Sequence, residues 1–112
     1  MTIQVVELLL EDGTSPYAEW FETLDPATAA KMVTAKLRME QGNLSRVEWF
    51  RGIGECKIDW GPGYRIYLAK DGLRIIVLLG GGSKKRQQKD IGLAVQRWES
   101  YRQRKANQAR RR

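Results

Sequence analysis

The sequence predicts an α+β fold with the element order β-α-α-β-β-β-α, in which a small antiparallel sheet is flanked by helices. Residues 56–79 contain three short runs separated by glycine turns, the first two alternating apolar and polar side chains and the third wholly apolar, a pattern typical of antiparallel strands. On either side of them, residues 15–41 and 84–105 repeat apolar side chains three and four positions apart, as amphipathic helices do. We expect the helices to pack on one face of the sheet and to leave the other face open.

The N-terminal elements are marked by their composition and by their caps. Residues 2–10 are rich in β-branched side chains and leucine, which predicts a strand. Ser15-Pro16 supplies an N-cap and a first-turn proline for one helix, and Asp25-Pro26 does the same for a second. Gly42 ends this second helix. Residues 44–54 are expected to be irregular.

Turn residues divide the C-terminal half into three strands and a helix. Gly61-Pro62-Gly63 separates the first two strands, and Asp71-Gly72 favours a tight hairpin between the second and the third. Residues 80–82, three consecutive glycines, are expected to break the third strand. The last helix is predicted from Lys84 to Lys105. Residues 1–105 then form a single domain, and residues 106–112 a basic tail that we expect to be disordered.

Composition excludes several classes of protein. The chain of 112 residues has no histidine and one cysteine, Cys56, so an internal disulfide, a structural zinc site and histidine-based catalysis are not expected. No metal and no cofactor are predicted. The longest apolar run is too short to cross a membrane, and the N-terminus lacks the basic start and the cleavage site of a secretory signal. We therefore expect a cytoplasmic protein without a membrane partner.

Charge is unevenly distributed along the chain. The net charge is +7, but residues 1–50 contain four Lys or Arg and eight Asp or Glu, whereas residues 51–112 contain sixteen and five. This polarity suggests that the C-terminal half meets a polyanion and the N-terminal half does not. The alternative is that the positive charge serves solubility alone.

Three polar side chains are predicted to share one face of the sheet. Strand alternation places Lys57, Arg65 and Tyr67 opposite the apolar set. Two cations on neighbouring strands repel each other mildly, so the stability of the sheet does not explain their position. Binding of a phosphate between them would explain it. An ordinary solvated face is the alternative. Further cations follow the third strand: Lys84, Lys85, Arg86 and Lys89.

Three motifs resemble a known family. The runs GPGYRIY at 61–67 and LLGGGSKK at 78–85, followed by Asp90-Ile91, are similar to the RelE/ParE superfamily of type II toxins, and closely to its HigB-like branch of addiction-module killer proteins. The resemblance covers about residues 15–104 and implies a RelE-like fold. The triple glycine lacks the spacing of a nucleotide-binding P-loop.

The resemblance implies a toxin that arrests translation and growth. RelE and HigB members cut mRNA in the ribosomal A site without a metal: the ribose 2′-OH attacks the adjacent phosphate, and basic side chains stabilise the charge that develops. Implied partners are the ribosome, mRNA and a cognate antitoxin, a helix-turn-helix HigA-like protein that forms a hetero-oligomer with the toxin. ParE members instead inhibit DNA gyrase by protein–protein binding without catalysis, and this alternative stays open, as does a module that only binds nucleic acid or its antitoxin.

The resemblance also assigns roles to individual residues. Lys57 matches a strand lysine of the RelE pattern, Arg65 matches its Gly-Tyr-Arg arginine, and Lys85 matches an arginine beyond the last strand. Asp59 replaces a second lysine, and Ile91 replaces a catalytic tyrosine, so Tyr67, Asp59 or a lysine of depressed pKa is left for proton transfer. The implied catalytic residues of the endoribonuclease are Lys57, Arg65, Tyr67 and Lys85. The implied RNA- or phosphate-binding residues are Lys84, Arg86, Lys89 and Asp59.

Overall fold

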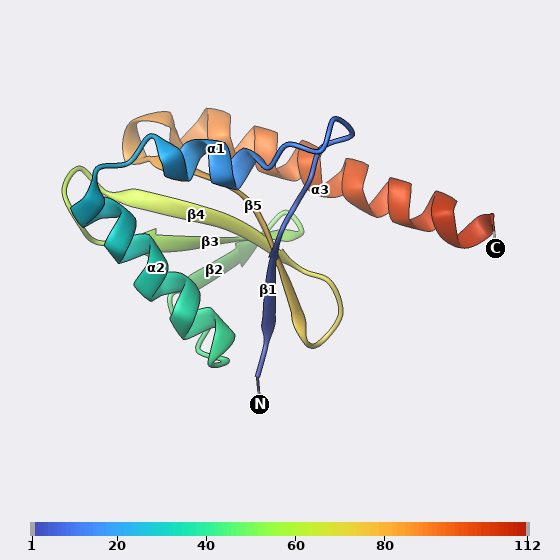
Figure 1. The fold of residues 1–112 in the computed structure, drawn as a ribbon, viewed down its shortest axis with the longest axis horizontal. Coiled ribbons are helices and arrows are strands. Elements are labelled where there is room, and N and C mark those ends of the chain that lie inside the picture. Colours follow the sequence, from blue (N-terminus) through green and yellow to red (C-terminus); the bar gives the residue numbers. More distant parts are fainter. Residues whose placement is uncertain (1, 112) are drawn as a thin grey trace.

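The computed structural model, which describes residues 2–111, consists of a five-stranded mixed sheet with helices on both faces (Figure 1). The α+β class is thereby confirmed. Along the chain the elements are β1 (Gln4–Glu7), α1 (Pro16–Glu22), α2 (Pro26–Glu40), β2 (Val47–Phe50), β3 (Ile53–Ile58), β4 (Tyr64–Lys70), β5 (Ile75–Ser83), a 3₁₀ turn (Lys84–Arg86) and α3 (Gln87–Arg110). No helix in this described part of the chain is long and apolar enough to span a bilayer.

The strand order in the sheet is β1-β5-β4-β3-β2. Strand β1 pairs with β5 in parallel, and the other neighbours are antiparallel, so the sheet is mixed rather than purely antiparallel. Strand β2 lies in the segment that was expected to be irregular. It is joined to β3 by Arg51 and Gly52, whose φ angles of 52° and 80° form a two-residue hairpin turn. Asparagine usually precedes the glycine in such turns, so an arginine there gave no recognisable signal.

Helices cover both faces of the sheet, so the expectation of an open face is wrong. Helices α1 and α2 pack on one face, where Tyr17 and Met32 join strand residues such as Ile66 in a first core. Helix α3 packs on the other face, where Ile91 and Trp98 join a second core. The sequence suggested a single apolar face because short alternating runs do not reveal that the second face is also covered.

The three glycines at 80–82 lie within β5 and do not break it. Both helix layers approach the strand at these positions. A β-carbon on Gly81 would lie 2.3 Å from the ring of Trp20 in α1, and a β-carbon on Gly82 would lie 2.0 Å from Asp90 Oδ2 in α3. The glycines therefore make room for side chains of the protein itself.

Helix α3 is longer than predicted and starts later. Residues 84–86 form the 3₁₀ turn, and α3 continues to Arg110, so residues 106–110, predicted to be disordered, are helical. Ala106 and Ala109, strong helix formers, favour this continuation. Figure 1 shows the C-terminal turns of α3 extending away from the sheet. Residue 112 lies outside the described residues.

Candidate phosphate-binding site

Lys57 and Arg65 occupy directly paired positions on β3 and β4, on the face that α3 covers. The prediction that they share one face is confirmed, but the expectation that this face is open to solvent is wrong at Arg65. Their surroundings differ, because Lys57 is exposed whereas the Arg65 side chain is only 8% exposed. Helix α3 begins at Gln87, so its first turn lies over Arg65 while Lys57 stays beyond the covered area.

A cleft of about 240 Å³ lies where β3, β4 and the 3₁₀ turn meet. We call it the turn cleft, since the Gly61–Gly63 turn forms part of its wall. Lys84 is held there because its backbone N–H donates to the carbonyl of Gly63 over 2.9 Å. The basic and acidic residues that line it are Lys57, Asp59, Arg65 and Lys84. Three cations and one carboxylate therefore converge on a small opening, which suits a singly charged phosphodiester.

Arg65 is fixed from behind by a buried acid that the sequence analysis missed. Its Nε lies 3.4 Å from Oε2 of Glu55 on β3, and the Glu55 side chain is only 1% exposed. Gln87, at the start of α3, donates from Nε2 to both carboxylate oxygens of Glu55, over 3.3 and 3.0 Å. The buried carboxylate thus holds the guanidinium by charge, although Nε makes no hydrogen bond to the described residues, and Nη1 lies 3.8 Å from the β-carbon position of Gly63 in the wall of the turn cleft.

One sequence signal could have identified Glu55. A charged residue between Ile53 and Lys57 falls on the same side of β3 as both, and a strand covered on both faces has few places for an unpaired acid. The irregular segment was predicted to end at residue 54 and the strand to begin at Cys56, so Glu55 was assigned to neither.

Tyr67 does not reach the turn cleft, so the catalytic role that the resemblance implies for Tyr67 is wrong for this site. It is 1% exposed and packs beneath α3 in the second core, because β4 is apolar on both faces at this point. Burial, and next the neighbouring carboxylate of Glu55, raise the pKa of the Tyr67 hydroxyl. The phenol is therefore protonated at neutral pH and enclosed, which excludes it as a proton acceptor for a bound substrate.

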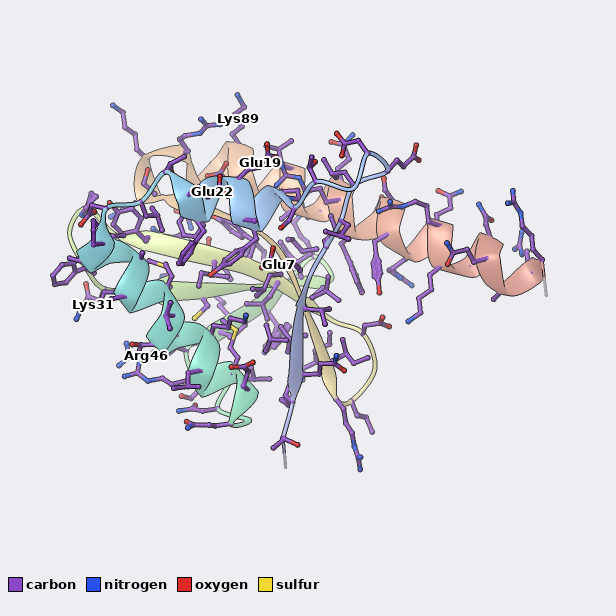
Figure 2. The ribbon with its side chains drawn as sticks, in the orientation of Figure 1. Glu7, Glu19, Glu22, Lys31, Arg46 and Lys89 are labelled. Carbon is purple, nitrogen blue, oxygen red and sulfur yellow. The ribbon has the colours of Figure 1, made fainter. Side chains whose placement is uncertain are left out.

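The remaining predicted cations lie outside the turn cleft. Lys85 is exposed on the 3₁₀ turn beside Lys84, and Lys89 projects from the first turn of α3, as Figure 2 shows. Arg86 lies on the other side of the turn, where its Nε is 3.9 Å from Oδ1 of Asp90. These three residues add positive potential near the cleft without lining it.

The two positions that depart from the family pattern have different environments. Asp59 lines the turn cleft, where a carboxylate could accept a proton. Ile91 is 7% exposed and packs into the core under α3, so this position holds the helix on the sheet and cannot contact a ligand. Within residues 2–111 there is no group of three His, Cys, Asp or Glu side chains able to hold a metal ion.

The arrangement favours binding and stabilising a phosphate that gains negative charge. Preorganised cations aimed at such a group lower the energy of a transition state more than that of the ground state. Arg65 is preorganised by Glu55, whereas Lys57 and Lys84 approach from two other elements.

Comparison with known proteins identifies a relative. No family model matches the chain, and no solved structure matches it. A protein of Haemophilus influenzae (strain Rd), whose name is "Uncharacterized protein", is 36% identical over 93 residues, which cover 81% of this chain and 88% of the relative. This chain belongs to the same family as that Haemophilus influenzae protein.

Proposed function

We propose that this protein has a RelE-like fold and is the toxin of a type II toxin–antitoxin system, a metal-independent endoribonuclease that cuts mRNA on the ribosome. The observation that carries the proposal is the turn cleft, where Lys57, Arg65 and Lys84 from three different elements surround one space of about 240 Å³. The family motifs at 61–67 and 78–85 lie in the walls of this cleft or directly beside it. A cognate HigA-like antitoxin would hold the toxin inactive in the cytoplasm.

In the proposed reaction the ribose 2′-oxygen attacks the adjacent phosphorus, and the bond to the 5′-oxygen breaks. The products are a 2′,3′-cyclic phosphate and a 5′-hydroxyl. Arg65 and Lys57 stabilise the extra negative charge on the phosphorane. Asp59 is the only carboxylate among the described residues that line the cleft, so it is our candidate to accept the 2′-OH proton, and Lys84 is our candidate to protonate the leaving oxygen.

Glu55 and Gln87 are positioning residues in this proposal. They touch Arg65 or each other rather than the substrate. A guanidinium held by a buried carboxylate loses less rotational freedom when it binds a phosphate, so more of its interaction energy is available in the transition state.

The sharpest test uses the two exposed lysines. Replacement of Arg65 would leave Glu55 buried without its partner and would unfold part of the population, whereas Lys57 and Lys84 are exposed and form no ion pair within residues 2–111. The double variant Lys57→Gln/Lys84→Gln should cut mRNA at least about 10²-fold more slowly and should relieve growth arrest. Primer extension on cellular mRNA measures the cuts directly.

A matched control removes two charges elsewhere. Lys36→Gln/Arg74→Gln changes the net charge equally, and neither residue lines the turn cleft. This control should cut and arrest growth like the parent protein. If Lys57→Gln/Lys84→Gln remained as toxic as the control, the turn cleft would not be the catalytic site.

Gyrase inhibition is a second candidate, favoured by one observation. The position at which cleaving relatives carry a catalytic tyrosine is the buried Ile91, so any proton transfer must use another group. A ParE-like inhibitor needs no proton transfer. Induction of the DNA-damage response without any mRNA cuts would favour this alternative.

A further inference from the structure

A second basic cleft lies on the opposite side of β3 from α3. It has a volume of about 290 Å³ and lies between α2 and the part of β3 that extends beyond β2. We call it the α2 cleft. The charged residues that line it are Lys31, Arg38, Arg46, Lys57 and Asp59. Figure 2 shows Lys31 and Arg46 on the α2 side of the molecule, away from the acidic pair Glu19 and Glu22 on α1.

This concentration of charge contrasts with the segment that supplies it. Residues 1–50 carry a net negative charge and contain four Lys or Arg, yet three of those four, Lys31, Arg38 and Arg46, line this one cleft. Among residues 2–111, none of these three forms an ion pair. Gathering unpaired cations around one opening opposes folding slightly, and an anionic ligand would reverse that effect.

The floor of the α2 cleft is apolar. Met39, Val47 and Ile58 line it together with the buried thiol of Cys56. Burial raises the pKa of that thiol, while Arg46 and Arg38 act against the rise, consistent with both guanidinium groups lying near the floor. Arginines above an apolar floor attract a phosphate more strongly than they would in open water.

The α2 cleft continues into the turn cleft. Residues 57–59 line both, so the cations of the two clefts form one track around the edge of β3. The track leads from Lys84 and Arg65 through Lys57 to Arg46 and Arg38. A ligand with phosphates at regular intervals could occupy both clefts at once, whereas a single free phosphate would fill only one.

An aromatic ring lies at the rim of this track. Trp60 follows Asp59 directly and is 37% exposed. Its Nε1 donates to Oγ1 of Thr28 over 3.2 Å, and Nζ of Lys31 lies 4.6 Å from the ring centroid. An indole fixed in this way and still partly exposed is a surface on which a nucleic-acid base can stack.

We infer that the α2 cleft binds the phosphodiester backbone of single-stranded RNA next to the linkage held in the turn cleft. This inference rests on the proposed function, because it takes the bound strand to be the substrate. Arg38 and Arg46 contact phosphates outside the reacting linkage, and Trp60 supports a flanking base. Cleavage therefore depends on a strand that extends beyond the reacting dinucleotide.

The test measures binding to a strand that cannot be cut. A fluorescently labelled single-stranded RNA of twelve nucleotides carries 2′-O-methyl riboses, which lack the attacking hydroxyl, and anisotropy is recorded over a range of salt concentrations. Arg38→Gln/Arg46→Gln should bind about tenfold or more weakly than the parent protein, and the slope of log affinity against log salt should fall by about 1.4, the value for two lost phosphate contacts.

The control is again Lys36→Gln/Arg74→Gln, which removes the same charge. Lys36 lies in α2 but does not line the α2 cleft, and Arg74 lies in the turn at the other end of β4. If the two double variants bound RNA equally, only the total charge would matter and the assignment of the cleft would be wrong. A parent protein that did not bind the strand at all would also overturn it.

Two further outcomes distinguish this inference from binding of an acidic protein partner and from the proposed catalysis. The first uses a poly-glutamate peptide of twelve residues. If the peptide bound the parent protein more tightly than the RNA does, and bound Arg38→Gln/Arg46→Gln more weakly than the parent protein, the α2 cleft would be assigned to an acidic protein partner instead. If cells showed no mRNA cuts but this variant still lost RNA binding, the proposed catalysis would fail while the RNA-binding cleft stood. If cuts were mapped in cells but Arg38→Gln/Arg46→Gln bound the RNA as tightly as the parent protein, the proposed catalysis would stand and the RNA-binding role of the α2 cleft would be wrong.

Discussion

The two faces of the sheet are built from the same strands but differ in chemistry. On the face covered by α1 and α2, β3 and β4 contribute Cys56, Ile58, Ile66 and Leu68, all of them apolar. On the face covered by α3, the same strands change along their length. Tyr67 and Ala69 are apolar and lie under the body of the helix, whereas Glu55, Lys57 and Arg65 are charged and lie near its first turn or beyond it.

The difference shows how a small domain combines stability with a charged site. On the first face the side chains of these strands are apolar throughout and contribute mainly hydrophobic stabilisation. The second does so only where α3 covers it, and at the end of the helix a buried ion pair takes the place of apolar packing. Charged groups are tolerated there because Glu55 neutralises Arg65 and accepts hydrogen bonds from Gln87.

Removing the buried acid should have the largest effect. Glu55→Ala leaves the guanidinium of Arg65 enclosed without its counter-charge, and we expect the free energy of unfolding to fall by about 3–5 kcal/mol. Urea denaturation measures the change. Glu48, the cross-strand partner of Glu55 on β2, is exposed and provides a matched control: Glu48→Ala should change stability by no more than about 0.5 kcal/mol.

A paired replacement then separates stability from function. Glu55→Leu/Arg65→Met fills the same space with apolar side chains, so much of the stability lost in Glu55→Ala should return. The cleavage that we propose should not return, because the preorganised cation is missing. Equal loss of stability in the single and the double variant would mean that the ion pair is not the reason for the effect.

The glycines of β5 test how closely the helices approach each face. In Gly81→Ala the new methyl group would meet the ring of Trp20 at 2.3 Å on the first face, so we expect a loss of about 1–3 kcal/mol from overpacking. Gly92, within α3, has no heavy atom of the described residues within 4 Å of its β-carbon position apart from its chain neighbours and the adjacent backbone of the helix itself. Gly92→Ala should therefore stabilise the protein by about 0.5–1 kcal/mol, because alanine favours the helix. Thermal unfolding of both variants measures these opposite shifts.

Sequence patterns predicted the elements better than their layers. The cap at Ser15 and the turn at 61–63 placed α1, β3 and β4 close to their observed positions, since these signals are local. Val33 and Leu37 are apolar and lie four positions apart in α2, yet they are 55% and 53% exposed, because the buried stripe of α2 runs through Met32 and Met39. Only the position of the sheet decides which stripe is buried.

The candidate site was predicted only in part, because local patterns again do not show which elements cover each face of the sheet. Alternation correctly placed Lys57 and Arg65 on one face, and Lys84 joined them because the end of β5 lies beside the 61–63 turn. The net charge summed over residues 1–50 is negative and so concealed the basic cleft that contains Arg38 and Arg46. The acids that outnumber the cations in this segment lie mainly on other surfaces. Tyr67 was misplaced because an alternating pattern does not show where a covering helix begins.

The smallest expected effect concerns Asp90, at the boundary between the apolar and charged parts of the second face. Burial raises the pKa of its carboxyl, and Arg86, Arg97 and Lys89 act against the rise. The unfolded chain therefore releases this proton at a lower pH than the folded protein does. As pH rises from about the ordinary value of 3.8 through the raised folded pKa, the parent protein should lose stability relative to Asp90→Asn, which does not ionise.

An acid shifted in the opposite direction provides the control for that experiment. Hydrogen bonds from the backbone and the side chain of Thr14, over 3.0 and 2.7 Å, lower the pKa of Asp12. The folded protein then releases the Asp12 proton before the unfolded chain does, so the parent protein should gain stability relative to Asp12→Asn as pH rises toward 3.8. Urea denaturation of both variants between about pH 3 and pH 7 should give slopes of opposite sign. Slopes of the same sign would mean that overall charge, rather than the burial of Asp90 against Gly82, sets the dependence.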